Sequence, residues 1–300
     1  MKAKAYTRKF LNKFVIGATK LAGIFNKKID GVLKTKDLYY SNKKTIENTL
    51  QIFHPKNTTE TMPIVFYFHG GGWMEFDKSV FRTLCKRIAE KNNVIVVNTN
   101  YRLAPAVSME EIIGDAIKAI KFSKKYLKER FNNNFANVLF AGDSAGAHIS
   151  SYLAYKNLNE KIGLENKTDL KGLILFYGVF NFKTAYTSRF KNIELFIQAA
   201  LGAENPTSER MELFSVSNKD LAGYPPCFIV SGECDKLHVS QSKQFQKILQ
   251  KNNIENHYVF FDKEEKLATH GFMAFDNVKT TIVVHQKLQE FITNLQKNKE

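Results

Sequence analysis

The sequence has few cysteines, few acidic residues and no long uncharged hydrophobic run, and each shortage bears on the kind of protein it can be. Its 3 cysteines are odd in number and include no CxxC pair, which suits a reducing compartment. No stretch of about 18 uncharged apolar residues occurs, so we expect no membrane-spanning helix. We therefore expect a cytoplasmic, globular protein, in keeping with a hydrophobic content of 44%.

The shortage of acidic side chains leaves the chain strongly basic. Its 44 Lys and Arg residues against 29 Asp and Glu residues give a formal net charge of +15. Such a charge can attract nucleic acid or an anionic membrane surface. The lysines are scattered through nearly every segment, however, and the sequence contains no arginine-rich run or nucleic-acid recognition motif. We expect no nucleic-acid partner and leave attraction to anionic surfaces open.

The N-terminus resembles a signal peptide only loosely, because its apolar part is short, is broken by Lys20 and lacks a clean small-residue cleavage site. In residues 10–25 the apolar residues recur at helical spacing with lysines between them, which predicts an amphipathic helix. We expect this helix to cover an apolar surface of the protein itself. Weak contact with a membrane surface is the alternative.

From residue 50 onward, short apolar runs alternate with amphipathic helical patterns. The expected strands are TLQIFH, PIVFYFHG, VIVVNTNYR, NVLFAG, GLILFYG, PCFIVSG and NHYVFF, and the expected helices cover residues 79–91, 108–130, 145–158, 238–252 and 277–297. This alternation predicts an α/β fold with a mostly parallel central sheet covered by helices on both faces. The first two runs, joined by PKNTTETMP, are expected to form an antiparallel hairpin at one edge.

One interval breaks this alternation. Residues 181–222 contain helical patterns but no strand, and they lie between two expected strands. A helical excursion there is expected to cap the strand ends, where ligands of α/β proteins bind. We predict a single domain over residues 1–300, with a helical cap contributed by residues 1–45 and 181–222.

The sequence GDSAG at 142–146 fits the G-x-S-x-G pattern between an expected strand and an expected helix. A serine on such a sharp turn is held in strained backbone, and the turn needs neighbours without bulky side chains. The helix that begins there directs its positive end at Ser144 and can supply a backbone N–H to an oxyanion. We predict that Ser144 is a nucleophile; an ordinary strand-to-helix turn is the alternative.

A nucleophilic serine needs a base, and the sequence offers 7 histidines. His270 lies in a loop after the last expected strand and before the C-terminal helix, where an α/β hydrolase requires its base. Of the other histidines, three are expected to be structural (His148, His257 and His285), two have no predicted role (His54 and His238), and His69 lies in the glycine-rich segment 66–73.

The imidazole in turn needs a carboxylate that fixes its tautomer and stabilises its charged form. Asp235 follows an expected strand, and the chain order Ser144, Asp235, His270 matches the hydrolase topology. Glu233 is the alternative acid.

Three consecutive glycines follow another expected strand in FYFHGGGW, residues 66–73. Their backbone can present N–H groups into a cavity and stabilise the negative charge of a tetrahedral intermediate. The alternative is a flexible turn, and the serine, acid and histidine in the required order favour the catalytic interpretation.

These motifs resemble the hormone-sensitive-lipase-like branch of the α/β hydrolases, which includes microbial carboxylesterases and cap-bearing lipolytic enzymes. The resemblance extends over roughly residues 50–295 and is carried by HGGGW at 69–73, YRLAP at 101–105, GDSAG at 142–146, and SGECDKL to HGF within 231–272. It implies that Ser144 is the nucleophile, His270 the general base and Asp235 its orienting acid.

The resemblance also implies which backbone groups stabilise the oxyanion. It assigns these N–H groups to Gly70, Gly71 and Ala145, with His69 and Gly72 in the supporting loop. YRLAP would be a structural signature, and the cap would come from the N-terminal helices and the insert before the acid-bearing strand.

The chain departs from the family pattern in several places. Ala106 stands where glutamate is usual and Lys236 where proline is usual, and the approach to the histidine, DKEEKLATHGF, is longer and more charged. Ala147 and His148 stand where glycine and a polar residue are more common. None of these differences removes a member of the expected triad, although those near the acid and the histidine could alter substrate access.

We therefore expect a serine hydrolase that cleaves carboxylic esters with short to medium or aryl acyl groups through an acyl-enzyme, without metal or cofactor. The expected pocket is apolar, because the capping insert contains Phe182, Tyr186, Phe190, Leu195, Phe196 and Ile197. The alternatives are the same machinery acting on an acyl-peptide, a formamide or an acetylated sugar, and a non-catalytic ligand-binding protein. The expected partner is a small-molecule ester, and a homo-oligomer is left open.

Overall fold

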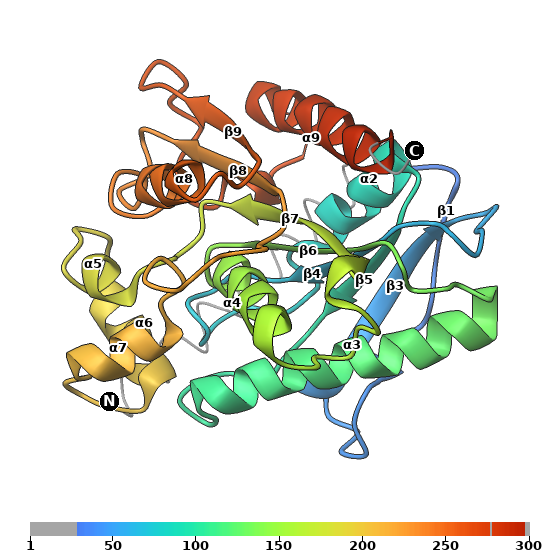
Figure 1. Ribbon diagram of the computed structural model, residues 1–300, viewed down its shortest axis with the longest axis horizontal. Helices are drawn as coiled ribbons and strands as arrows, with labels where there is room; N and C mark the ends of the chain where they lie inside the picture. The colour runs from blue at the N-terminus through green and yellow to red at the C-terminus, as the bar shows by residue number, and fades with distance from the viewer. Residues whose placement is uncertain (1–28, 277, 298–300) are drawn as a thin grey trace.

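The central feature of the fold is one large twisted sheet. The computed structural model describes residues 29–276 and 278–297, and within them nine strands form a sheet in the order β1-β3-β5-β4-β6-β7-β8-β9, with β2 also paired to β3 (Figure 1). The strands are β1 (Val32–Lys34), β2 (Leu38–Tyr39), β3 (Thr49–Pro55), β4 (Ile64–Phe68), β5 (Ile95–Thr99), β6 (Val138–Asp143), β7 (Leu170–Phe176), β8 (Cys227–Gly232) and β9 (Asn256–Phe261).

Most of this sheet is parallel. Each neighbouring pair from β5 through β4, β6, β7 and β8 to β9 is parallel, whereas β1 and β2 pair with β3, and β3 with β5, in the antiparallel direction. The central strands β4 and β6 are buried at every position, as expected for strands covered on both faces. The predicted α/β class is confirmed.

The predicted hairpin between the first two apolar runs is wrong. β3 pairs with β5, and β5 lies between β3 and β4. The apolar sequence of β4 requires burial on both faces and a partner on each side, and the helical crossover from β4 to β5 supplies one parallel partner. The segment between β3 and β4 is long enough to pass the intervening strand.

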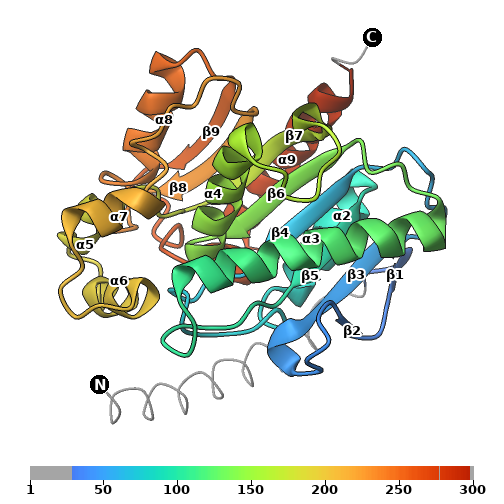
Figure 2. The ribbon, with the colours of Figure 1, turned by 60° about the horizontal axis from the view of Figure 1, so that its bottom comes forward.

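Helices cover both faces of the sheet (Figures 1 and 2). Alternate strand residues contribute to two buried clusters, one beneath α2 (Arg82–Asn92) and α9 (Lys279–Lys297), the other beneath α3 (Met109–Phe131), α4 (Ala145–Asn159) and α8 (Ser242–Lys251). Short 3-10 helices occur at Ile46–Asn48 (η1), Lys167–Asp169 (η2) and Phe272–Ala274 (η3). Among the described helices, none has the length and apolar character needed to cross a membrane.

The interval 181–222 is helical, as predicted. It forms α5 (Phe182–Tyr186), α6 (Ile193–Leu201) and α7 (Ser208–Phe214), which lie together at one end of the sheet (Figure 1). The amphipathic helix predicted at 10–25 lies outside the described residues. Residues 29–45, which we expected to be part of the helical cap, instead form β1 and β2, because the outer edge of β3 offers unpaired backbone groups.

Candidate active site

Ser144 lies on a sharp turn between β6 and α4. Its backbone has φ 49° and ψ −115°, a conformation that a non-glycine residue rarely adopts. A Cβ on Gly142 would overlap the Gly146 backbone, and one on Gly146 would overlap the Phe68 carbonyl oxygen of β4. Glycine is therefore required at both positions by close backbone approach, and the tight turn leaves the Ser144 side chain at the carboxyl end of the sheet.

Other strained residues surround the same point. Trp73, Phe76 and Tyr177 have φ values of 60°, 71° and 38°, and none of them is a glycine or an asparagine. Trp73 and Phe76 follow the three glycines. Tyr177 directly follows β7, whose last residue, Phe176, accepts from the Ser144 N–H at 2.9 Å. Backbone strain of this kind is typical of functional sites.

His270 bridges Ser144 and Asp235. Its Nε2 lies 2.8 Å from Ser144 Oγ, and its Nδ1 lies 2.9 Å from Asp235 Oδ2. With the ring proton on Nδ1, the imidazole donates to the carboxylate and accepts from the serine hydroxyl. Asp235 Oδ1 accepts from the Leu237 N–H at 2.9 Å, so both carboxylate oxygens are held. The structure thus brings together the three residues that the sequence predicts, from positions 126 and 35 residues apart.

Two aromatic rings fix the histidine from other elements. The Tyr177 ring lies 5.0 Å from the imidazole and the Phe190 ring, from the segment before α6, lies edge-on at 4.6 Å. Tyr177 Oη also accepts from the Met273 N–H of η3 at 3.3 Å, which ties the histidine loop to the end of β7. The side chain of His270 remains 17% exposed.

The alternative acid lies elsewhere. Glu233 is exposed, and its Oε2 accepts from the Lys263 N–H at 3.0 Å, so its carboxylate is bound to the backbone ahead of the histidine. Two other histidines are bound to residues outside the triad: His54 Nδ1 lies 3.2 Å from Thr58 Oγ1, and His238 Nδ1 lies 2.9 Å from Ser231 Oγ.

The glycine loop presents its N–H groups differently from what the sequence led us to expect. The Gly70 N–H, which we expected to bind an oxyanion, donates to Asp143 Oδ1 at 2.8 Å. Gly71 and Gly72 have positive φ values of 115° and 57°, which only glycine adopts at low cost. Within the described part of the chain, no protein acceptor takes the N–H groups of Gly71, Gly72 or Ala145. The N–H groups of Gly71, Gly72 and Ala145 are therefore free to bind a ligand oxygen, whereas the Gly70 N–H is already engaged by Asp143.

His69 connects the glycine loop to Tyr101. Its Nδ1–H donates to the Gly70 carbonyl at 2.7 Å, its ring stacks on Tyr101 at 4.4 Å, and the Tyr101 hydroxyl donates to the His69 carbonyl at 2.7 Å. Complete burial lowers the pKa of His69 to about 4, so the ring is neutral near pH 7. His69 can therefore support the loop without introducing a charge.

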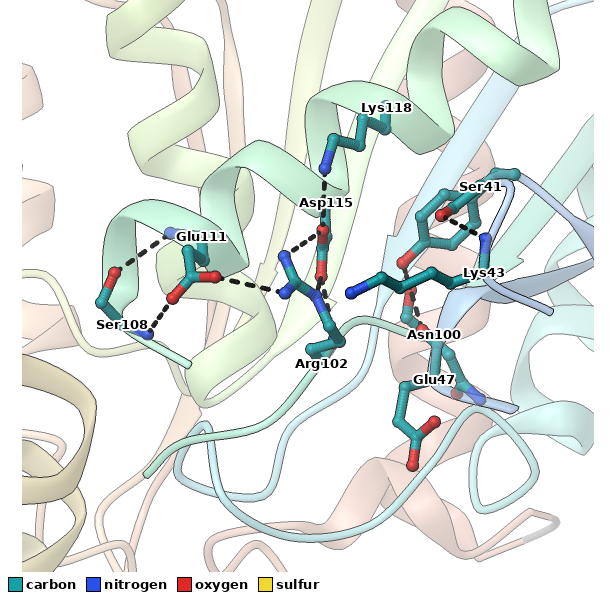
Figure 3. Close-up of polar contacts among 10 residues, drawn as sticks. Ser41, Lys43, Glu47, Asn100, Arg102, Ser108, Glu111, Asp115 and Lys118 are labelled. Carbon is teal, nitrogen blue, oxygen red and sulfur yellow. Dashed lines mark hydrogen bonds and ion pairs between the residues drawn. The ribbon is translucent and has the colours of Figure 1, made fainter. Parts of the chain in front are cut away.

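The loop that carries Tyr101 is itself anchored to α3 (Figure 3). The Arg102 guanidinium donates to both carboxylate oxygens of Asp115, at 2.7 and 2.9 Å, and to Glu111 at 3.2 Å. Glu111 also completes a capping box with Ser108 at the start of α3. The YRLAP segment thus has the structural role that the family resemblance implies.

His148 connects the glycine loop to the capping insert. Its Nδ1 accepts from Trp73 Nε1 at 3.3 Å, and its Nε2–H donates to the Phe214 carbonyl at the end of α7 at 2.9 Å. Burial lowers the pKa of His148 to about 4, consistent with this neutral tautomer. His148 therefore links Trp73 to the end of α7, in keeping with the structural role predicted for it.

Asp143 is a buried acid beside the nucleophile. Its Oδ1 accepts from Gly70 N–H and, at 2.9 Å, from the Tyr67 hydroxyl. Burial raises the pKa of the Asp143 carboxyl to about 7, while these hydrogen bonds oppose the rise. Sequence reasoning found no role for Asp143. The sequence did place an acidic residue at the end of an apolar strand, and a buried acid at such a position needs hydrogen-bond partners.

A cavity of about 330 Å³ opens onto Ser144 and His270. Its wall is largely apolar and comes from the glycine loop, the capping insert and the histidine loop. Phe190 and Phe196 are the members of the predicted aromatic set that line it, whereas Phe182 is buried against Trp73. Sequence reasoning missed further apolar lining residues, Phe76, Val80, Phe81, Ile193 and Phe275.

A family model described as the alpha/beta hydrolase fold matches residues 65–274, which include the glycine loop, the elbow and the histidine. The chain belongs to the α/β hydrolase family. The resemblance to the hormone-sensitive-lipase-like branch is thereby confirmed, and residues 65–274 of this α/β hydrolase contain Ser144, Asp235 and His270.

Several known proteins that are similar to this α/β hydrolase are esterases. The acetyl esterase of Salmonella schwarzengrund (strain CVM19633) is 22% identical over 243 residues, which cover 77% of this chain and 71% of that protein. Esterase B from Lactobacillus rhamnosis (HN001) has a TM-score of 0.84 at 20% identity, covering 99% of this chain and 96% of its own. A structure of the same esterase with a C4-C4 tributyrin phosphonate inhibitor has a TM-score of 0.83 at 20% identity, with 99% and 97% coverage. At these identities the structural likeness establishes the fold.

Proposed function

We propose that this α/β hydrolase cleaves carboxylic esters with short to medium or aryl acyl groups through an acyl-enzyme on Ser144. The observation that carries the proposal is the continuous hydrogen-bonded series from Ser144 Oγ through His270 to Asp235, at 2.8 and 2.9 Å. Nucleophile, base and orienting acid within such distances form the arrangement that activates a serine for acyl transfer.

In the first half-reaction, Ser144 Oγ attacks the ester carbonyl carbon while its proton passes to His270 Nε2. The carbonyl π electrons move to oxygen, and the N–H groups of Gly71, Gly72 and Ala145 stabilise the resulting oxyanion. When the carbonyl re-forms, the bond to the alcohol oxygen breaks and the proton on Nε2 passes to that oxygen. Water then repeats the sequence and releases the acid together with free Ser144.

Asp235 stabilises the imidazolium that forms in each half-reaction. Its carboxylate is 1% exposed and receives both the histidine Nδ1–H and the Leu237 N–H, so it stays fixed while the proton moves between Ser144 and the substrate. The positive end of α4, which begins at Ala145, adds to the stabilisation of the oxyanion.

The preference for short to medium or aryl acyl groups is supported by the cavity. Its volume of about 330 Å³ is near the lower end of the range for small-molecule sites, and phenylalanine rings line it, two of them (Phe190 and Phe196) from the capping insert. Each buried methylene contributes about 0.8 kcal/mol, so we expect turnover to improve with acyl length until the cavity is filled. The acetyl esterase and the phosphonate-bound esterase among its relatives are in keeping with small acyl groups.

The test is hydrolysis of p-nitrophenyl esters from acetate to palmitate by the wild-type protein and Ser144→Ala. We expect a maximum at short to medium chains and a loss of about 10⁴-fold or more in kcat/KM for Ser144→Ala. Ser150→Ala is the matched control, because its hydroxyl on the same helix donates to the Ala141 carbonyl, away from His270. Near wild-type turnover by Ser144→Ala would overturn the assignment.

The same assay includes an anilide, a formamide and an acetylated sugar. Faster cleavage of any of these than of every ester would assign a different acyl bond to the same machinery. Absence of turnover on the whole panel, with saturable binding of an ester, would instead indicate a non-catalytic ligand-binding protein.

A further inference from the structure

Asp143 lies at the contact between the two loops of the proposed active site. It is 3% exposed, and its carboxylate accepts from the Gly70 N–H at 2.8 Å and the Tyr67 hydroxyl at 2.9 Å. Burying a carboxyl group costs free energy, which the hydrogen bonds to Gly70 and Tyr67 only partly offset. The proposed mechanism makes no use of this carboxyl group, so catalysis by the triad does not explain why it is buried here.

The hydrogen bond between Gly70 and Asp143 joins the glycine loop directly to the turn that carries Ser144. Asp143 is the residue before Ser144, and Gly70 is the residue before Gly71 and Gly72. A Cβ on Gly70 would overlap Asp143 Oδ2, so backbone and carboxylate are in direct contact. One side chain therefore connects the chain position of the nucleophile with that of the oxyanion donors.

The remaining contacts hold the loop on other sides but do not duplicate this connection. His69 donates to the Gly70 carbonyl and stacks on Tyr101, while Trp73 donates to His148. These contacts join the loop to the segment after β5 and to α4. Of these contacts, only the Asp143 carboxylate holds a loop N–H from the elbow itself, within one residue of Ser144.

We propose that Asp143 is a positioning residue, which sets the Gly71 and Gly72 N–H groups at the oxyanion position relative to Ser144 Oγ. The proposal rests on the proposed function. Oxyanion stabilisation depends on donors placed within a few tenths of an ångström, and the loss of one donor lowers kcat by about 10²–10³. Without the carboxylate, the buried Gly70 N–H lacks its acceptor and the loop can turn to find another.

The experiment compares Asp143→Ala, Asp143→Asn and Tyr67→Phe on the best p-nitrophenyl ester. We expect Asp143→Ala to lose about 10²-fold in kcat, with KM changed by less than about threefold, because the donors act mainly on the transition state. Asp143→Asn keeps an oxygen at the acceptor position and should recover most of this loss. Tyr67→Phe removes the other partner of the carboxylate and leaves the Gly70 bond, so it should lose much less than Asp143→Ala.

A second readout separates positioning from a general structural effect. The affinity for a trifluoromethyl ketone, which forms a tetrahedral oxyanion adduct on the serine, should fall in parallel with kcat across the variants. Thermal unfolding checks that each variant is folded. If Asp143→Ala does not fold, Asp143→Ser takes its place, because its hydroxyl is polar but does not extend to the position of Oδ1.

The proposal is overturned if folded Asp143→Ala or Asp143→Ser retains wild-type kcat. It is also overturned if kcat falls while trifluoromethyl ketone affinity is unchanged, or if Asp143→Asn is as impaired as Asp143→Ala. Absence of ester hydrolysis by the wild-type protein would refute the proposed function instead. That outcome is identified before any variant is compared.

Discussion

The Phe190 ring and the imidazole of His270 meet in an edge-to-face arrangement, with their centroids 4.6 Å apart. Phe190 belongs to the capping insert, whereas His270 belongs to a loop between β9 and α9. The insert therefore contributes directly to the environment of the proposed base. His270 also contacts Tyr177, so its ring touches both the insert and the residue that follows β7.

Removing the Phe190 ring should weaken catalysis without removing a reacting group. An aromatic pair contributes about 0.5–1.5 kcal/mol, so Phe190→Ala is expected to lower kcat/KM by up to about tenfold. Leu213→Ala is the control, because Leu213 is 47% exposed on α7 of the same insert and is expected to leave kcat/KM unchanged. Equal effects of the two substitutions would contradict a specific role for the Phe190 contact.

The two acids after β8 should differ sharply in their effect on turnover. Asp235→Asn leaves the geometry but removes the charge that fixes and stabilises the imidazolium, so kcat should fall by about 10³–10⁴-fold. Glu233→Gln changes a carboxylate that accepts a backbone N–H from Lys263, and kcat should stay within about threefold of wild type. Steady-state kinetics at pH 8 distinguish the two, and a larger loss for Glu233→Gln would reassign the acid.

Two glycine substitutions should have opposite effects on stability. A Cβ on Gly146 would overlap the Phe68 carbonyl of β4, which is backbone that cannot move aside, so Gly146→Ala should fail to fold or unfold at a much lower temperature. Gly114, in the second turn of α3, has open space at its Cβ position. Gly114→Ala should therefore raise the unfolding free energy by about 0.5–1 kcal/mol. Thermal unfolding measures both, and a stable Gly146→Ala protein would contradict the close approach of β4 to the elbow.

Asp143 should make stability depend on pH. Burial raises its pKa from a usual value near 3.8 to about 7 in the folded protein, so the folded state binds this proton more tightly than the unfolded state. Its favourable contribution is fully present below about pH 4 and is lost as the pH rises to about 7.

Asp143→Asn cannot ionise, so its unfolding free energy relative to wild type should increase between pH 4 and pH 7. At about 1.4 kcal/mol per pH unit, the change reaches about 4 kcal/mol. Urea unfolding at several pH values measures this change. Glu212→Gln, which replaces an exposed acid on α7, is the control, and its unfolding free energy relative to wild type should not change with pH. A difference that does not change with pH would show that Asp143 has an ordinary pKa.

Much of the fold could be predicted because local patterns determine it. Continuous apolar runs such as IVFYF in β4 require burial on both faces, and the amphipathic segments between the runs then have to cover the sheet. The identity of the strand that pairs with β3 is not encoded locally. It depends on β5 entering between β3 and β4, which the sequence on either side of the connecting segment does not reveal.

The site was predictable to a similar extent. Ser144, Asp235 and His270 follow or flank recognisable strand ends in a fixed chain order, so parallel topology brings them together. The partner of a backbone N–H, in contrast, depends on tertiary contacts. Gly70 and Gly72 are equivalent in the sequence HGGG, and the fold distinguishes them: the Gly70 N–H donates to the Asp143 carboxylate, whereas Gly72 has a positive φ.

The most direct test of the central claim is covalent labelling of the wild-type protein with a fluorophosphonate, followed by digestion and mass spectrometry. The account predicts that Ser144 displaces fluoride and gains one phosphonyl group. It predicts no adduct in Ser144→Ala and much slower labelling in His270→Ala. No adduct on wild-type protein, or an adduct at another residue that persists in Ser144→Ala, would contradict the assignment of Ser144 as an activated nucleophile.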